Sequence, residues 1–178
     1  MNRATWLVSG LFVALLAVAP LFLNTYQVDV LNSIGLYALL ALSLNLILGE
    51  AGLFNMGHAA FYAMGAYTAA ILNTRYQIPI LWTLPLSGLV AGLFALAVAR
   101  PVVHLRGDYL LIVTIGVGEI VRIALVNDVF GITGGANGIF GISRPKLFGF
   151  VIRRPEEFFY LIWGFVALTI FLFLRLKQ

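Results

Sequence analysis

Long apolar stretches, separated by short polar or charged segments, follow one another along most of this chain. A helix needs about 20 mostly apolar residues to cross a bilayer, where only helices and closed barrels satisfy their backbone. The stretches lack the period-two alternation of strands, so they predict helices. The candidates are Thr5–Leu23, Leu31–Leu48, Leu53–Leu72, Ile80–Ala99, Tyr109–Val126 and Phe158–Leu174. The pattern predicts an all-α fold, a polytopic transmembrane helix bundle of about six membrane segments.

The third stretch differs from the others because small residues recur in it at helical spacing. Pairs four positions apart are Ala59 and Ala63, Gly65 and Ala69, and, in the fourth stretch, Gly88 and Gly92. Such faces let neighbouring helices approach closely in lipid. We therefore predict close packing at these faces. As an alternative, the segment Gly49–Met56 is a break in the helix within the membrane, which would change the number of spans.

The first stretch also fits a second interpretation. Arg3, the apolar run and the small residues at 17–19 resemble a cleavable signal peptide. The run is long for the apolar core of a signal peptide, and Pro20 stands where the mature chain would begin. A membrane span is therefore the favoured interpretation.

Composition supports a membrane protein. Only 10% of the residues are charged and 62% are hydrophobic, whereas ordinary soluble domains carry roughly 25% charged residues. The chain has no cysteine, which rules out disulfides and thiolate metal sites. The net charge of +4 is small, and basic residues lie between the apolar runs. This pattern indicates membrane topology and a lipid bilayer as the surroundings, not a nucleic-acid partner.

The basic residues predict an orientation for the spans. If Arg3 is cytoplasmic and all six runs cross, Arg100 and Arg106 also face the cytoplasm, and so does Arg175. This is the excess of Lys and Arg expected in short cytoplasmic connections. Arg75 and the connection 127–157 then lie outside.

Enzyme signatures are missing from the sequence. It contains no phosphate-binding loop of the G-x-x-x-x-G-K-[ST] type, no H-E-x-x-H zinc motif and no G-x-S-x-G elbow. His58 and His104 lie in different segments without a carboxylate at ligand spacing. We predict that the chain is not an enzyme and holds no cofactor or metal. ATP hydrolysis associated with it would belong to another chain.

Glu119 and Arg122 are the ionisable residues inside a predicted span. An unpaired charge at the bilayer centre costs about 2.5–3.5 kcal/mol on insertion scales. Residues three apart share a helix face and neutralise each other in part. Gly116 lies on the same face, where a neighbouring helix can approach. The favoured interpretation is a structural ion pair, and the alternative is a polar point on a translocation path.

Three further polar residues are candidate path or interhelical contacts. Asn55 precedes the small-residue helix and is placed to cap it. His58 opens that helix, and a hydrogen bond between helices is its favoured role over contact with a substrate or gate. Asn45 stands among leucines in the second run and is expected to bond across helices.

A glycine-rich segment lies in the predicted external loop 127–157. Five glycines occur in the eleven positions from Gly131 to Gly141, which allows turns with positive φ. No Lys-Ser or Lys-Thr pair follows, so a nucleotide site is not predicted. We expect a structured loop that offers a docking surface for a partner. Its candidate residues are Thr133, Gly134, Gly135, Asn137 and Gly138.

Three separated segments resemble one known family. They are SLNLILGEAGLFNMGHAAFYAMGAYTAAIL (43–72), LRGDYLLIVTIGVGEIVR (105–122) and TGGANGI (133–139). In this order they resemble the LivM-type permease of branched-chain amino acid ABC importers, relatives of which are assigned to urea or other amides. The resemblance implies a permease subunit in the bacterial inner membrane. It also implies a LivH-like sister permease, two cytoplasmic ATP-binding subunits and a periplasmic substrate-binding protein as partners.

Members of that family continue into a second half, with a cytoplasmic loop that docks on the ATPase. Residues 1–178 are therefore expected to be a single membrane domain, the N-terminal part of a longer permease. Taken alone, the chain is expected not to drive ATP-dependent uptake. Two alternatives from other classes stay open. One is a self-associating channel or proton-coupled secondary transporter, with Glu119 as the coupling residue, and the other is a truncated permease remnant without transport activity.

Overall fold

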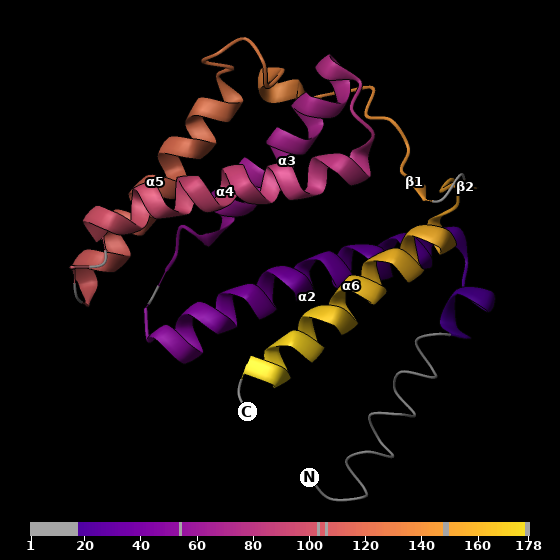
Figure 1. The fold of residues 1–178 in the computed structure, drawn as a ribbon, viewed down its shortest axis with the longest axis horizontal. Coiled ribbons are helices and arrows are strands. Elements are labelled where there is room, and N and C mark those ends of the chain that lie inside the picture. Colours follow the sequence, from indigo (N-terminus) through magenta and orange to yellow (C-terminus); the bar gives the residue numbers. More distant parts are fainter. Residues whose placement is uncertain (1–17, 54, 103, 106, 148–149, 177–178) are drawn as a thin grey trace, which may run out of the picture. The chain divides into compact units, whose positions relative to one another are not determined.

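The structure is a computed structural model that describes residues 18–176 apart from 54, 103, 106 and 148–149. Five α-helices make up most of this part of the chain, as the all-α prediction requires (Figure 1). In chain order the elements are η1 (Ala19–Leu21), α2 (Thr25–Ala51), α3 (His58–Tyr76), α4 (Ile80–Val102), α5 (Asp108–Val126), η2 (Gly135–Asn137), β1 (Lys146–Leu147), β2 (Phe150–Val151) and α6 (Pro155–Leu176). The short β1–β2 hairpin, which is antiparallel, was not predicted.

Four of the helices are long and apolar enough to cross a membrane: Thr25–Glu50, Ile80–Val102, Asp108–Val126 and Pro155–Arg175. The prediction of about six spans is therefore confirmed for four. Most of the predicted first span, Thr5–Leu23, lies outside the described residues. The predicted third span begins five residues later than expected and forms α3, whose alanines, tyrosines and terminal polar residues make it less apolar than the other four helices.

The chain divides into two compact units, Met1–Leu42 with Arg153–Gln178, and Ser43–Ile152. In the first unit, the early part of α2 packs against α6 (Figure 1). Gly35 makes this contact possible, because a Cβ there would lie 2.7 Å from a methyl carbon of Ile162. At the end of the seam, the Asn32 side-chain amide donates to the carbonyl oxygen of Pro155 over 3.1 Å.

In the second unit, α3 packs along α4, and the small residues that allow it differ in part from the predicted ones. A Cβ at Gly65 would lie 3.8 Å from Cβ of Ala91, an ordinary contact. Nothing lies within 4 Å of a Cβ placed at Gly88 or Gly92, so the prediction of close packing at that pair is wrong within the described chain. Consecutive helical positions differ by about 100° around the axis, so Ala91 faces α3 and Gly92 does not.

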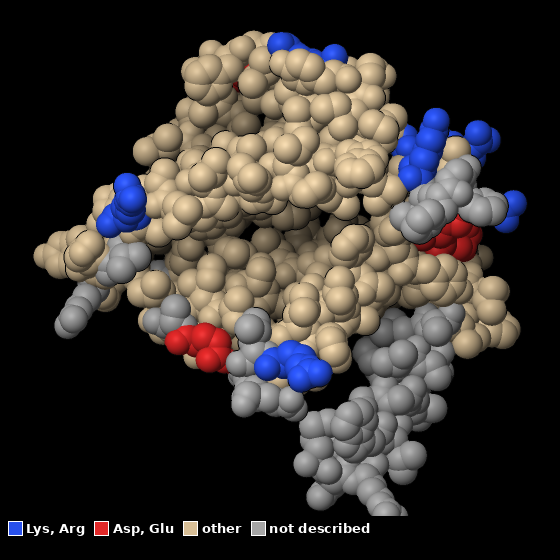
Figure 2. Space-filling view, in the orientation of Figure 1, with Lys and Arg blue, Asp and Glu red and all other residues tan. Residues whose placement is uncertain are grey.

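The opposite side of α4 is apolar and open. Trp82, Leu89, Leu93 and Leu96 are each more than half exposed. Figure 2 shows that charged side chains occupy a few separate places on the face drawn, while other residues cover most of the described surface. Exposed apolar side chains of this kind suit contact with lipid chains. The buried hydroxyl groups of α4 are satisfied locally, since Thr83 and Ser87 donate to carbonyl oxygens of their own helix.

Candidate translocation pocket

A break in the helical backbone leads into the pocket. α2 ends at Ala51 and α3 begins at His58, so the break predicted within Gly49–Met56 lies between these two helices. The Asn55 side-chain oxygen accepts from the backbone N–H of Gly57 over 2.9 Å. Gly57 precedes the first helical residue, and α3 has no side-chain N-cap. Asn55 therefore closes the turn before the helix, and the prediction that it caps the helix is wrong.

The break is fixed against the middle of α5. The backbone N–H of Met56 donates to the Thr114 hydroxyl over 3.2 Å. A Cβ at Gly57 would lie 2.3 Å from the carbonyl oxygen of Thr114, so only glycine fits. Gly118 approaches the same point, since a Cβ built there would lie 3.5 Å from Cα of Gly57. The close approach expected at Gly116 occurs two residues later, because nothing lies within 4 Å of a Cβ at Gly116.

Glu119 and Arg122 form the predicted ion pair on one face of α5. Arg122 donates from Nε to one carboxylate oxygen over 2.9 Å and from Nη2 to the other over 2.6 Å. The contact is bidentate, which is the strong geometry for a guanidinium and a carboxylate. The pair is nevertheless open, with 63% of the Arg122 side chain and 50% of the Glu119 side chain exposed.

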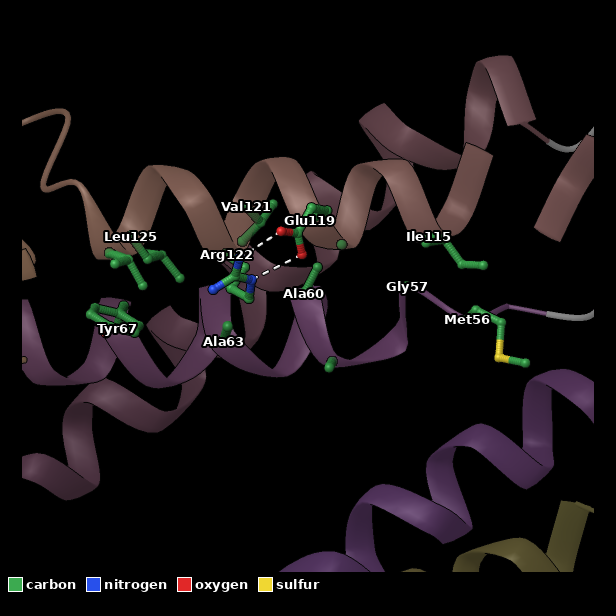
Figure 3. Close-up of a pocket in the computed structure, with 13 residues that line it drawn as sticks. Met56, Gly57, Ala60, Ala63, Tyr67, Ile115, Glu119, Val121, Arg122 and Leu125 are labelled. Carbon is green, nitrogen blue, oxygen red and sulfur yellow. Dashed lines mark hydrogen bonds and ion pairs between the residues drawn. The ribbon is translucent and has the colours of Figure 1, made fainter. Parts of the chain in front are cut away.

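A cavity of about 470 Å³ lies between α3 and α5 and includes this pair in its wall (Figure 3). The α3 side is made of small residues, among them Gly57, Ala60 and Ala63, with Tyr67 farther along the helix. On the α5 side, apolar residues flank the ion pair. These are Ile115, Val121, Leu125 and Val126. The arrangement is an apolar cavity with a single charged pair, the composition typical of a small-molecule site.

The position of the pair along α5 limits what can face it. α5 runs Asp108–Val126, and its middle residue is Val117, two positions before Glu119. A charge at this depth of a spanning helix is costly against lipid, so intramembrane ionisable groups face a bundle interior or a water-filled cavity. The cavity between α3 and α5 meets this requirement.

The other candidate residues of this region lie away from the pocket wall. Nε2 of His58 lies 2.6 Å from the Ser43 hydroxyl, which is the hydrogen bond between helices predicted for this histidine. Asn45 is exposed on α2. Its predicted bond to another helix is not formed among the described residues.

The glycine-rich segment folds into a structured loop at the end of α5, as predicted. Thr133 is its buried centre, and its hydroxyl donates to the Leu125 carbonyl over 2.7 Å and to the Asp128 carboxylate over 2.9 Å. The Thr133 backbone N–H also donates to Asp128 over 2.7 Å. The Thr133 N–H and then its hydroxyl, by bonding the ionised carboxylate, hold the pKa of Asp128 below its ordinary value.

Glycine is required at two positions of this loop. Gly134 has φ +73°, and a Cβ there would lie 2.1 Å from the carbonyl oxygen of Gly138. Gly135 has φ +60° and lies close to the carbonyl oxygen of Val126. Asn137 is exposed. The docking role predicted for these residues stays a prediction, whereas Thr133 and Gly134 have clear structural roles.

Two residues that sequence reasoning missed join this loop to α3. The buried Asn73 side chain donates to Ile78 and Ser143 and accepts from the Ser143 backbone N–H over 2.7 Å. Arg75 donates to the Gly131 carbonyl over 2.7 Å. The C-terminal end of α3 is therefore joined to the loop that follows α5. A polar Asn at the end of an apolar run was the available signal.

Known proteins are similar to this chain over most of its length. Residues 26–178 match the family described as the branched-chain amino acid transport system permease component. No solved structure matches the chain. The high-affinity branched-chain amino acid transport system permease protein LivM of Salmonella typhimurium strain LT2 is 46% identical over 147 residues, which are 81% of this chain and 34% of LivM.

The LivM protein of Escherichia coli strain K12 is 45% identical over 148 residues, covering 82% of this chain and 35% of the relative. The chain thus spans about a third of the length of the curated relatives it matches. The match to the family is far longer than half the chain and covers the four candidate spans except for Thr25. The chain belongs to the family of branched-chain amino acid transport permease components, a multi-pass membrane family of transport proteins and not of enzymes.

Proposed function

We propose that this chain is part of the transmembrane permease of an ABC importer that carries branched-chain amino acids, or a related small amino acid or amide, across the bacterial inner membrane. The observation that carries the proposal is the family match over residues 26–178. The names of the LivM relatives, which state the same transport role, support it. The chain itself contributes helices and a path, and it performs no covalent chemistry.

The partners follow from this class of transporter. We propose a LivH-like sister permease, two cytoplasmic ATP-binding subunits that supply the energy, and a periplasmic binding protein that delivers the solute. The structured loop around Thr133 is the proposed outer docking surface. Its fixed attachment to α3 and α5 supports this role, because a preformed surface loses little conformational entropy when a partner binds.

The pocket between α3 and α5 is the proposed section of the path in this chain. The break at 52–57 lies beside the middle of α5, and irregular backbone at such depth is tolerated where it is buried in protein or lines a cavity. Transporters of several folds place solute sites at broken helices near the midplane. The proton-coupled alternative has less support, because both oxygens of Glu119 are held by Arg122.

The test is transport by the native complex. The complex is purified through a tag on this chain, its subunits are identified by mass spectrometry, and it is reconstituted into vesicles with ATP. We expect two ATP-binding subunits to co-purify and leucine uptake to require ATP. Uptake that persists without ATP and follows an imposed proton gradient would instead establish the secondary-transporter alternative.

A further inference from the structure

The charged groups of the pocket form a closed, neutral pair. Glu119 and Arg122 are the only acidic and basic residues among the described residues that line the cavity. Each satisfies the other through two hydrogen bonds, and about half or more of each side chain is still exposed. The pair is therefore stable without a ligand and accessible to one.

Neutrality restricts which ligands the pair accepts. An anion that binds Arg122 displaces Glu119, which is left as an unpaired charge near the middle of a candidate spanning helix, and a cation does the reverse to Arg122. An unpaired charge at that depth is costly. A ligand that carries one positive and one negative group replaces both lost contacts at once. The electrostatics of the pocket thus favour zwitterions over ions of either sign.

The remaining walls specify the rest of the ligand. Gly57, Ala60 and Ala63 leave space opposite the pair, and Ile115, Val121 and Leu125 make the wall beside it apolar. A cavity of about 470 Å³ falls within the range of roughly 300–1,000 Å³ typical of small-molecule sites. The cavity offers no other charged group for a polar side chain, so it fits a compact aliphatic one.

We propose that Glu119 and Arg122 exchange their mutual ion pair for contacts with the ammonium and carboxylate groups of a zwitterionic α-amino acid, whose aliphatic side chain lies against the small residues of α3. In an α-amino acid both groups are attached to one carbon, which matches two partners that are adjacent on one helix face. Glu119 and Arg122 would then determine specificity, beyond their structural role. The inference rests on the proposed function, in which this cavity lies on the solute path.

The experiment measures binding to the tagged native complex in detergent, without the binding protein, so that selectivity reports the permease. The probes are leucine, 4-methylpentanoate, which lacks the ammonium group, and 3-methylbutylamine, which lacks the carboxylate. We expect leucine to bind roughly tenfold or more tightly than either analogue, the size of effect that a charge-assisted hydrogen bond supplies. In the double variant Glu119→Gln with Arg122→Gln, leucine affinity should fall to that of the analogues.

The double variant separates recognition from structure, because it leaves no charge unpaired. If the pair were only structural, the double variant would retain the leucine affinity of the wild type, and this result would overturn the inference. Equal binding of all three probes to the wild type would overturn it too. Asp108→Asn is the matched control, since it removes a charge from the same helix outside the cavity and should leave binding unchanged.

A second variant covers the case in which the double variant does not fold. Glu119→Asp keeps both charges and moves the carboxylate by one methylene group, so we expect leucine to lose affinity while 4-methylpentanoate is unaffected. Equal effects on both probes would contradict the inference. ATP-driven leucine uptake by the wild-type complex tests the proposed function separately, so it can stand while the inference fails.

Discussion

α3 packs against α4 and α5 in different ways. Along α4 the contact is extensive, and Gly65 and Ala91 meet at an ordinary distance. Against α5 the backbone approaches closely at Gly57, the residue before α3, and beyond this point the two helices line the open cavity. The same alanine-rich helix thus forms a packed seam on one side and an open site on the other.

The polar groups at the α3–α4 contact and at the α3–α5 contact also differ in how accessible they are. In the α4 seam, the buried hydroxyl groups of Thr83 and Ser87 are bonded within their own helix. In the α5 seam, Glu119 and Arg122 are open to the cavity. The cavity is held at both ends, by Gly57 against Thr114 and by the loop that joins α5 to Asn73. Small residues alone therefore do not distinguish a packed face from an open cavity, and the polar groups opposite them do.

The largest effect is expected at the closed end of the α5 seam. Gly57→Ala puts a methyl group within 2.3 Å of a backbone oxygen, which cannot move without displacing α5. Overpacking of this kind costs about 1–3 kcal/mol or more, which corresponds to a fall of roughly 3–10 °C in the apparent melting temperature. The measurement is thermal unfolding of the purified protein in detergent. Gly116→Ala is the control, because its methyl group meets nothing within 4 Å, and an equal fall there would contradict the comparison.

The next effect is expected at the other end of the cavity. Asn73→Ala removes the hydrogen bonds to Ile78 and Ser143 that hold the loop. Neutral hydrogen bonds contribute about 0.5–1.5 kcal/mol each, so the loop should open at least roughly tenfold more often. Trypsin cleavage after Lys146 measures this opening. Thr74→Ala, which removes only a bond within α3, should leave the cleavage rate unchanged.

The contact between α3 and α4 is tested with an introduced disulfide, which is not expected to lower stability. A Cβ at Gly65 would lie 3.8 Å from Cβ of Ala91, and disulfides span a Cβ separation of about 3.8 Å. The natural chain has no cysteine, so a Gly65→Cys and Ala91→Cys pair introduces the only two thiols. We expect an oxidant to protect both thiols from maleimide labelling. The pair Gly65→Cys with Gly92→Cys should stay labelled. Protection of that pair would mean that Gly92, and not Ala91, faces α3, which contradicts the comparison.

The sequence predicted the features that depend on local spacing. Helical periodicity located α2, α4, α5 and α6 to within a few residues, apart from the first turns of α2, and the three-residue spacing of Glu119 and Arg122 placed them on one face. Which face of a helix packs against its neighbour was not predicted. A spacing of four residues holds for Gly88 and Gly92 as well as for Ser87 and Ala91, so spacing alone does not say which pair faces α3. The bond from Asn73 to Ser143 joins residues 70 positions apart, which no local pattern reveals.

The smallest effect concerns the pKa of Asp128, which lies beyond the end of α5 in the loop that holds one end of the cavity. Bonds from the Thr133 backbone N–H and hydroxyl lower the pKa of this carboxyl group. A lowered folded-state pKa means that the stabilisation is complete above the unfolded value, about 3.9, and is lost only as the pH falls through the folded value. The loop anchor should therefore persist in mild acid.

Thr133→Val removes the hydroxyl donor and keeps the backbone one, so the pKa of Asp128 should rise part of the way toward its ordinary value. Carboxyl carbon NMR measures this directly, because the chain contains three aspartates and Asp128→Asn identifies the resonance. Thr74→Val is the control, since its hydroxyl bonds only to Ala70. If the Asp128 titration were the same in Thr133→Val as in the wild type, the hydroxyl would not contribute to the anchor, and this end of the cavity would depend on Asn73 and Arg75.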